Sequence, residues 1–243
     1  MKLILICLLI VSLSGQSRDI DYVNDPFGYY ANSNCPLEYI NIDSQSIDLD
    51  LLAAGTEPAE DEGAALINLP LPFTFYNETY TSLVISSNGY LAFANDLNQE
   101  NGADFSNDCL FPSIPDNQPQ TSARIMPFHD DLSRGTDGKI HWAHYSECPL
   151  SGHINPCTIF EWQNWKKTDS DQDFSFQTIL IHGSSVIVMQ HNPTTPAPDS
   201  ASIGFQNSRL FSGQILSCNQ AETALNNQAF CFQNPYIFAN GFE

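Results

Sequence analysis

The stretch from Leu71 to Phe93 limits the chain to a β-rich fold. Phe73 and Phe75 fall on one side of an extended segment and their neighbours on the other, because successive side chains in a strand point to opposite faces. A β-branched apolar run at Leu83–Ile85 follows, and Asn88-Gly89 then supplies residues that accept the positive φ angles of a type I′ turn. The stretch therefore predicts three short strands and a hairpin that reverses at Asn88-Gly89.

The same alternation recurs along most of the chain. It predicts strands at 124–128, 139–145, 157–165, 174–181, 186–191 and 201–206, and one or two edge strands within 37–52. No segment of useful length has the period of an amphipathic helix. We therefore predict an all-β fold, an antiparallel β-sandwich with long ordered loops and disulfides.

The N terminus has the features of a secretory signal peptide. Met1 and Lys2 precede an apolar run at Leu3–Val11, and small residues follow it, which predicts a signal peptide at 1–17. The apolar run is too short to span a bilayer, and no second stretch is apolar enough for a membrane anchor. We expect a secreted protein, periplasmic or extracellular, with an N-terminal arm at 18–36, a single β-sandwich domain at 37–233 and a C-terminal tail at 234–243.

The cysteines predict disulfides. Loss of the signal peptide removes Cys7 from the seven cysteines and leaves six, an even number in an exported chain. Cys148 and Cys157 flank a loop with Pro and Gly whose ends meet if two strands pair across it, so this local pair is the first hypothesis. Cys218 with Cys231 and Cys35 with Cys109 complete the predicted set, although six half-cystines permit many other pairings, and the alternative is buried free thiols.

The chain is strongly acidic, with 8 basic and 28 acidic residues and a formal charge of −20. We predict no nucleic-acid partner, because phosphate binding needs a basic surface. Asp130, Asp131 and Asp137 surround a predicted turn, where three carboxylates can converge on calcium. The alternative is that these side chains cap backbone amides of the turn.

The candidate catalytic residues form no recognisable constellation. His141 and His144 are three residues apart on a predicted strand, so they point to opposite faces and are poor partners for one metal. The chain lacks the G-x-S-x-G motif of many serine hydrolases. Glu161 is the first candidate for a glycosidase carboxylate. Three tryptophans form either a platform for sugar rings or part of the core: Trp142, Trp162 and Trp165.

Several motifs resemble those of a known family. The chain has a Pro-Phe-x-Phe-Tyr strand, a Tyr-Thr-Ser step and a Ser-Ser-Asn-Gly-Tyr-Leu hairpin within 72–93, then Ile114-Pro115, RIMPFHDDL at 124–132, a Trp-bearing strand at 161–162 and ASIGFQN at 201–207. Together these are similar to the extracellular domain named after nidogen, as found in secreted bacterial proteins, over roughly Ile67 to Asn207. The C-terminal IFANGFE at 237–243 resembles a short tail of exported bacterial proteins. The resemblance implies a secreted β-sandwich and leaves its activity open.

These observations favour a secreted, non-enzymatic β-sandwich protein for adhesion, surface structure or ligand binding, whose partner is an unknown extracellular glycan or protein. Two alternatives remain open: a secreted hydrolase acting on glycan or peptide, and a calcium-dependent, lectin-like carbohydrate binder. A nucleophile–base pair or two close carboxylates in the folded protein would distinguish the hydrolase from the binding module.

Overall fold

The computed structural model describes residues 29–32, 35–106, 122–168, 170–196, 200–208, 213–219 and 229–234. These residues form fourteen strands and no helix. The predicted signal peptide, most of the predicted arm and the predicted tail beyond Asn234 lie outside the described ranges.

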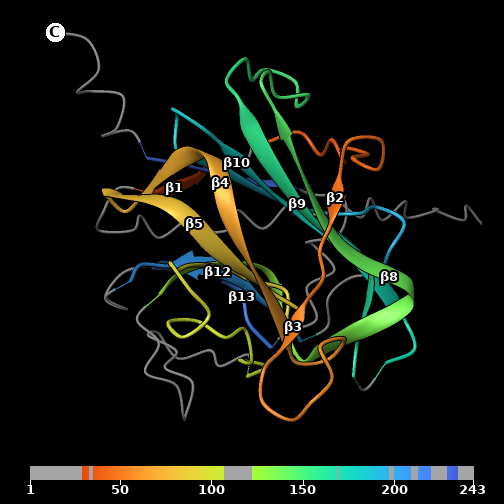
Figure 1. Cartoon of the computed structure of the whole chain (residues 1–243). Coiled ribbons are helices and arrows are strands. Elements are labelled where there is room, and N and C mark those ends of the chain that lie inside the picture. Colours follow the sequence, from red (N-terminus) through yellow and green to blue (C-terminus); the bar gives the residue numbers. More distant parts are fainter. Residues whose placement is uncertain are drawn as a thin grey trace, which may run out of the picture.

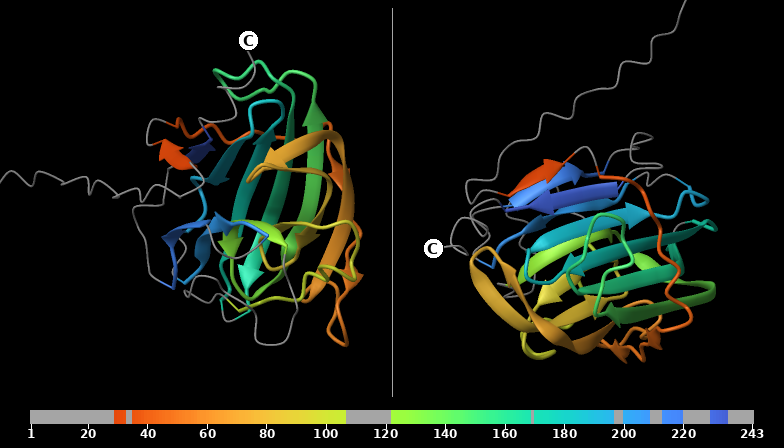
Figure 2. Two further views of the ribbon diagram at one scale, coloured as in Figure 1. Left: turned by 90° about the vertical axis from the view of Figure 1, so that its left-hand side faces the viewer. Right: turned by 90° about the horizontal axis from the view of Figure 1, so that it is seen from above.

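The strands form two seven-stranded sheets, and every pair of neighbouring strands is antiparallel. The first sheet runs in the order β1 (Tyr30–Asn32), β14 (Ala229–Gln233), β11 (Val186–His191), β10 (Asp173–Ile181), β9 (Cys157–Lys167), β8 (Leu132–Tyr145) and β2 (Ile47–Asp48). The second runs β13 (Gly213–Ser217), β12 (Ser202–Gln206), β7 (Ala123–His129), β6 (Leu91–Phe93), β5 (Glu78–Ser86), β4 (Gly63–Phe75) and β3 (Leu52–Ala53). The two sheets pack face to face (Figures 1 and 2), which confirms the predicted antiparallel β-sandwich.

Aromatic side chains fill the space between the sheets. Phe73 and Phe75 of β4 point inward and are fully buried, as the alternation predicted. From the opposite sheet, Trp162 stacks on Phe176 with ring centroids 4.9 Å apart. The indole N–H of Trp162 also donates to the carbonyl oxygen of Ser86 across the sandwich (2.7 Å), so the buried indole leaves no unsatisfied donor and joins the sheets.

The predicted hairpin forms, but its turn is of another type. β5 and β6 pair in antiparallel register, and the Gly89 N–H donates to the carbonyl of Ser86 (3.3 Å), which closes a three-residue loop. Gly89 has a φ of 74°, whereas Asn88 is not at positive φ, so the type I′ assignment was wrong. Positive φ at two central residues occurs instead at Tyr76 (51°) and Asn77 (61°), between β4 and β5. Close contact with β7 constrains the turn at Gly89, because a Cβ at this position would collide with the backbone of β7.

Disulfides fasten the edge and one loop of the first sheet. The predicted Cys148–Cys157 bridge is present. Cys35 pairs with Cys231, with their Cα atoms 5.6 Å apart, so the predicted Cys35–Cys109 and Cys218–Cys231 pairs are not formed. The reason is topological: β1 lies against β14, which places the N-terminal segment beside Cys231. Cys218 is also disulfide-bonded, and Cys109 lies outside the described residues.

A buried arginine holds the loop at 94–106 on the second sheet. Arg124 of β7 forms ion pairs with Asp104 and with Glu100 (2.8 Å), and its guanidinium lies 4.5 Å from the ring centroid of Tyr90. The side chains of the ion-paired residues are at most 4% exposed. Burial alone would raise the pKa of the Asp104 carboxyl. The charges of His129 and Arg124 outweigh this effect, so the pKa of Asp104 is lowered. The described part of this loop is thus held on the sheet by a charged cluster rather than by apolar packing alone.

Candidate functional site

A row of polar side chains crosses the outer face of the first sheet. Gln190 of β11 pairs with Gln177 of β10, Gln177 with Glu161 of β9, and Glu161 with His141 of β8. Residues paired between neighbouring strands face the same side of a sheet, so the four side chains lie next to one another. Each is at most 5% exposed. Buried polar groups need partners, and a segment from another part of the chain supplies them.

That segment is residues 35–48, which we call the strap. It runs across the strands of the first sheet, from the Cys35–Cys231 bridge to β2 (Figure 2). Gln190 accepts from the N–H of Glu38 (3.3 Å) and donates to its carbonyl (2.9 Å). Gln177 does the same with Ile40, at 3.3 Å and 2.6 Å. The two side-chain amides thus take the place of a neighbouring strand's backbone. In the predicted edge-strand region 37–52, only β2 (Ile47–Asp48) and the first residue of β3 (Leu52–Ala53) lie in strands.

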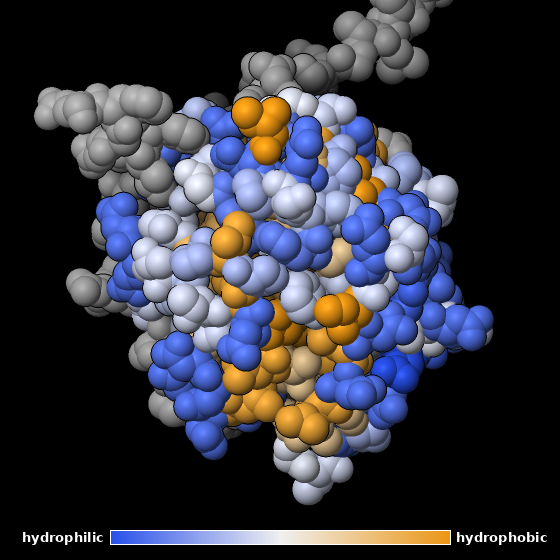
Figure 3. All heavy atoms as spheres, turned by 45° about the horizontal axis from the view of Figure 1, so that its top comes forward, coloured by the Kyte–Doolittle hydropathy of each residue, from blue (hydrophilic) through white to orange (hydrophobic). Residues whose placement is uncertain are grey.

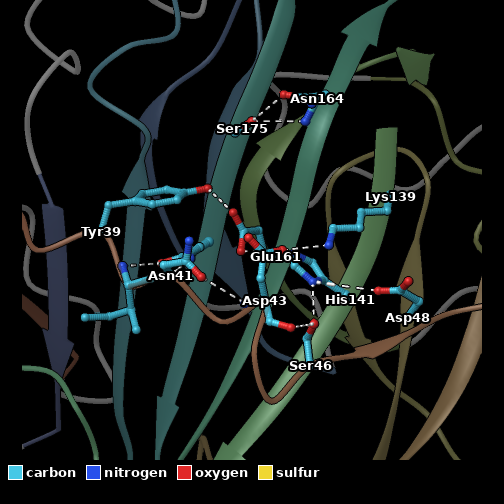
Figure 4. A network of polar contacts seen from close by, with 12 residues as sticks. Tyr39, Asn41, Asp43, Ser46, Asp48, Lys139, His141, Glu161, Asn164 and Ser175 are labelled. Carbon is cyan, nitrogen blue, oxygen red and sulfur yellow. Dashed lines mark hydrogen bonds and ion pairs between the residues drawn. The ribbon is translucent and has the colours of Figure 1, made fainter. Parts of the chain in front are cut away.

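The strap also completes a hydrogen-bonded chain centred on His141 (Figure 4). His141 Nε2 lies 3.0 Å from Glu161 Oε2, and His141 Nδ1 lies 2.9 Å from Ser46 Oγ. Tyr39 donates its hydroxyl to the other oxygen of Glu161 (2.8 Å). Burial and the charge of Glu161 raise the pKa of Tyr39 well above its usual value, so Tyr39 remains a donor. At the rim, Lys139 and Asp43 form an ion pair (2.7 Å), and this hydrogen bond lowers the pKa of Asp43.

β2, at the end of the strap, and β3, which follows it in the chain, each lie at one edge of a sheet. Among the described residues, no further strand pairs with the outer edge of either one. Large apolar side chains are exposed here: Ile47 at 56%, Leu52 at 62% and, on the adjoining β4, Leu66 at 39%. Figure 3 shows an apolar area at the lower part of the face, towards the end where Figure 1 places β3. We call these three residues the apolar edge.

The predicted calcium ligands have protein partners. Asp130 accepts from Ser200 Oγ (2.6 Å) and from the N–H of Asp131 (3.0 Å), and Asp131 accepts from Thr168 Oγ1 (2.8 Å). Asp137 sits at positive φ within an irregularity of β8. Within the described ranges, no three His, Cys, Asp or Glu side chains are arranged to hold a metal ion. The structure therefore does not bring Asp130, Asp131 and Asp137 together as a calcium site.

The other predicted site residues are separated. His141 faces the strap, whereas His144 faces the opposite side of β8 and contacts Thr158 Oγ1 (3.1 Å), as the strand period predicted. Trp162 and Trp165 are fully buried in the core, and Trp142 packs partly buried against it. The tryptophans therefore belong to the core and form no exposed platform for sugar rings.

The polar row was missed at the level of sequence. Gln177 and Gln190 each neighbour apolar outward residues of their own strand, namely Ile179 and Ile181 on β10 and Val186 and Val188 on β11. An amide among apolar neighbours on an outward face was the available signal, because it indicates a covered face rather than a solvated one. The segment that covers this face could not be identified from the neighbouring sequence, because Glu38 and Gln190 lie 152 residues apart.

The described residues include no helix that is long and apolar enough to cross a membrane. Searches of the curated proteins and of the solved structures gave no match. A comparison with protein-family models matches residues 38–235 to the family described as NIDO related. This match covers most of the chain and includes the greater part of the strap and the strands from β2 to β14. The chain therefore belongs to the NIDO-related, or nidogen-related, family of extracellular modules.

Proposed function

We propose that this protein is a secreted adhesion or ligand-binding module that holds a protein partner at its apolar edge. The observation that carries the proposal is the exposure of Ile47 on β2 and of Leu52 on β3, each of which lies at one edge of its sheet. Removing such side chains from water on binding contributes roughly 25 cal/mol for each Å² of apolar surface. Family membership, two disulfides and the predicted signal peptide support a place outside the cell.

The surroundings of the apolar edge indicate the chemistry of the partner. Four exposed carboxylates flank it along the chain: Asp48, Asp50, Glu57 and Glu60. Interfaces commonly combine an apolar centre with a polar rim, and opposite charges across the rim speed association. The partner that fits is a protein surface with an apolar strip bordered by lysine or arginine. The buried positions of Trp162 and Trp165 favour a protein over a glycan as ligand.

Binding of the mature protein to an immobilised panel of extracellular proteins and glycans tests this proposal. We expect a protein partner whose affinity falls at least tenfold in the variant Ile47→Asp/Leu52→Asp and falls moderately as salt increases. Ile154→Asp is the matched control, because Ile154 is 83% exposed but lies in the Cys148–Cys157 loop. Equal loss in both variants, or unchanged binding in the edge variant, would contradict the apolar edge as the binding surface.

A further inference from the structure

We infer that Ser46 is a nucleophile activated by His141 and Glu161, and that carboxylic esters acylate it. Ser46 Oγ lies 2.9 Å from one ring nitrogen of His141, and the other ring nitrogen lies 3.0 Å from Glu161. A hydroxyl, an imidazole and a carboxylate in hydrogen-bond reach of one another constitute the arrangement that activates serine nucleophiles on unrelated folds. This activity goes beyond the proposed binding role, which uses the apolar edge.

Burial separates the base from solvent while leaving the nucleophile within reach. His141 is fully buried and Glu161 is 5% exposed, whereas Ser46 is only half-buried, at the end of the turn that precedes β2. The two oxygens of Glu161 have different donors, His141 on one side and Tyr39 on the other. The carboxylate therefore cannot rotate freely, and it fixes the orientation of the imidazole (Figure 4).

The direction of the hydrogen bonds follows from the donors and acceptors present. A carboxylate only accepts, so Nε2 of His141 carries a hydrogen and donates to Glu161. In the neutral ring, Nδ1 is then an acceptor, and the Ser46 hydroxyl donates to it. The other acceptor near Ser46 Oγ, the carbonyl oxygen of Asp43, is farther away at 3.5 Å. The serine proton is thus directed at the base.

The reaction is acyl transfer followed by hydrolysis. Ser46 Oγ attacks the carbonyl carbon of the ester while its proton passes to His141 Nδ1. The bond between the carbonyl carbon and the alcohol oxygen then breaks, and the alcohol takes the proton from Nδ1. A water molecule, deprotonated by the same nitrogen, attacks the acyl-serine, releases the carboxylic acid and restores the hydroxyl. Glu161 is a positioning residue in this scheme, because it stabilises the imidazolium that forms after each proton transfer.

The location of Ser46 limits the substrate to esters that reach a surface hydroxyl. Lys139 lies two residues from His141 on the same face of β8, and its ammonium is held in an ion pair with Asp43 (2.7 Å) at the surface. Small acyl esters carried on a larger exposed molecule therefore fit the site, whereas a substrate that needs a deep cavity does not.

Labelling of the oxidised, full-length mature protein with a fluorophosphonate tests the proposal, with p-nitrophenyl acetate hydrolysis as the second readout. We expect one phosphonyl group on Ser46, found by peptide mapping, and loss of both label and hydrolysis in Ser46→Ala. Ser44→Ala is the matched control, because Ser44 is exposed in the same turn and lacks the contact with His141. It should keep full labelling.

Glu161→Gln tests the positioning residue, since it keeps hydrogen-bonding atoms but removes the charge. We expect labelling to slow at least tenfold while the circular dichroism spectrum and both disulfides are unchanged. Should this buried exchange unfold the protein, the surface pair Ser46→Ala and Ser44→Ala still decides the question. Absence of label on the folded wild-type protein, or equal labelling of Ser46→Ala, would overturn the inference. The chain of hydrogen bonds would then serve only to fasten the strap to the sheet.

Discussion

Replacement of Arg124 by methionine should be the most damaging exchange of a charged residue in the second sheet. Arg124 is 2% exposed, and its two partner carboxylates are equally buried, so the variant leaves two negative charges in the interior without a counter-ion. Breaking a buried ion pair by removing one partner costs about 3–5 kcal/mol of unfolding free energy. The lost contact with the ring of Tyr90 adds roughly 0.5–2 kcal/mol.

Denaturant titration followed by tryptophan fluorescence measures this loss. In a domain of this size, the loss of the ion pairs alone corresponds to a fall in melting temperature of roughly 6–20 °C. Arg134→Met is the control: its pair with Glu60 spans 3.9 Å between side chains that are 40% and 57% exposed. Exposed pairs contribute about 0–1 kcal/mol, so this variant should unfold close to the wild-type midpoint.

Removal of the two carboxylate charges as well should rescue the Arg124→Met variant. The triple variant Arg124→Met/Glu100→Gln/Asp104→Asn should recover most of the lost stability, because it removes the uncompensated charges together with the arginine. Equal midpoints for Arg124→Met and Arg134→Met would refute the reasoning. A triple variant less stable than the single variant would show that the hydrogen bonds to the 94–106 loop, and not the buried charges, dominate.

The remaining predictions concern a turn, a titration and a metal. Gly89→Ala should unfold at a lower denaturant concentration than Gly152→Ala, because both positions have positive φ but only the Cβ at Gly89 meets the backbone of β7; equal losses would contradict this. Burial raises the pKa of Glu62 to about 7, so the folded state binds its proton more tightly, and stability should fall as pH rises from about 4.5 to 7, by at most roughly 3 kcal/mol. Glu62→Gln should remove this fall, and an unchanged pH profile would exclude Glu62 as its source. Chelators should leave the melting curve unchanged, since Asp130 and Asp131 already have protein partners; a lower melting temperature would restore the calcium hypothesis.

The fold was predictable because most of its strands can be recognised from the alternation of apolar and polar residues within each strand. Alternation placed Phe73 and Phe75 in the core and put His141 and His144 on opposite faces of one strand. These outcomes depend only on the period of the strand and on which face is apolar. The family resemblance rested on the same segments, and the family match confirms it.

What failed depends on contacts between distant parts of the chain. The turn at Asn88-Gly89 is set by packing against β7, and the partner of Cys35 is set by the position of β14, 196 residues away. The strap could not be recognised because Gln177 and Glu161 come from neighbouring strands whose register is fixed only in the folded sheet. The local Cys148–Cys157 bridge and two short edge strands formed, whereas the predicted Cys35–Cys109 and Cys218–Cys231 pairs are replaced by the long-range Cys35–Cys231 bridge.

Both the apolar edge and the Ser46 site require that the strap lies across the first sheet. Peptide mapping of the exported, unreduced protein by mass spectrometry tests this most directly. We expect disulfide-linked peptides that join Cys35 to Cys231 and Cys148 to Cys157. A peptide joining Cys35 to Cys109, or Cys218 to Cys231, would contradict the placement of the strap and with it both proposed sites.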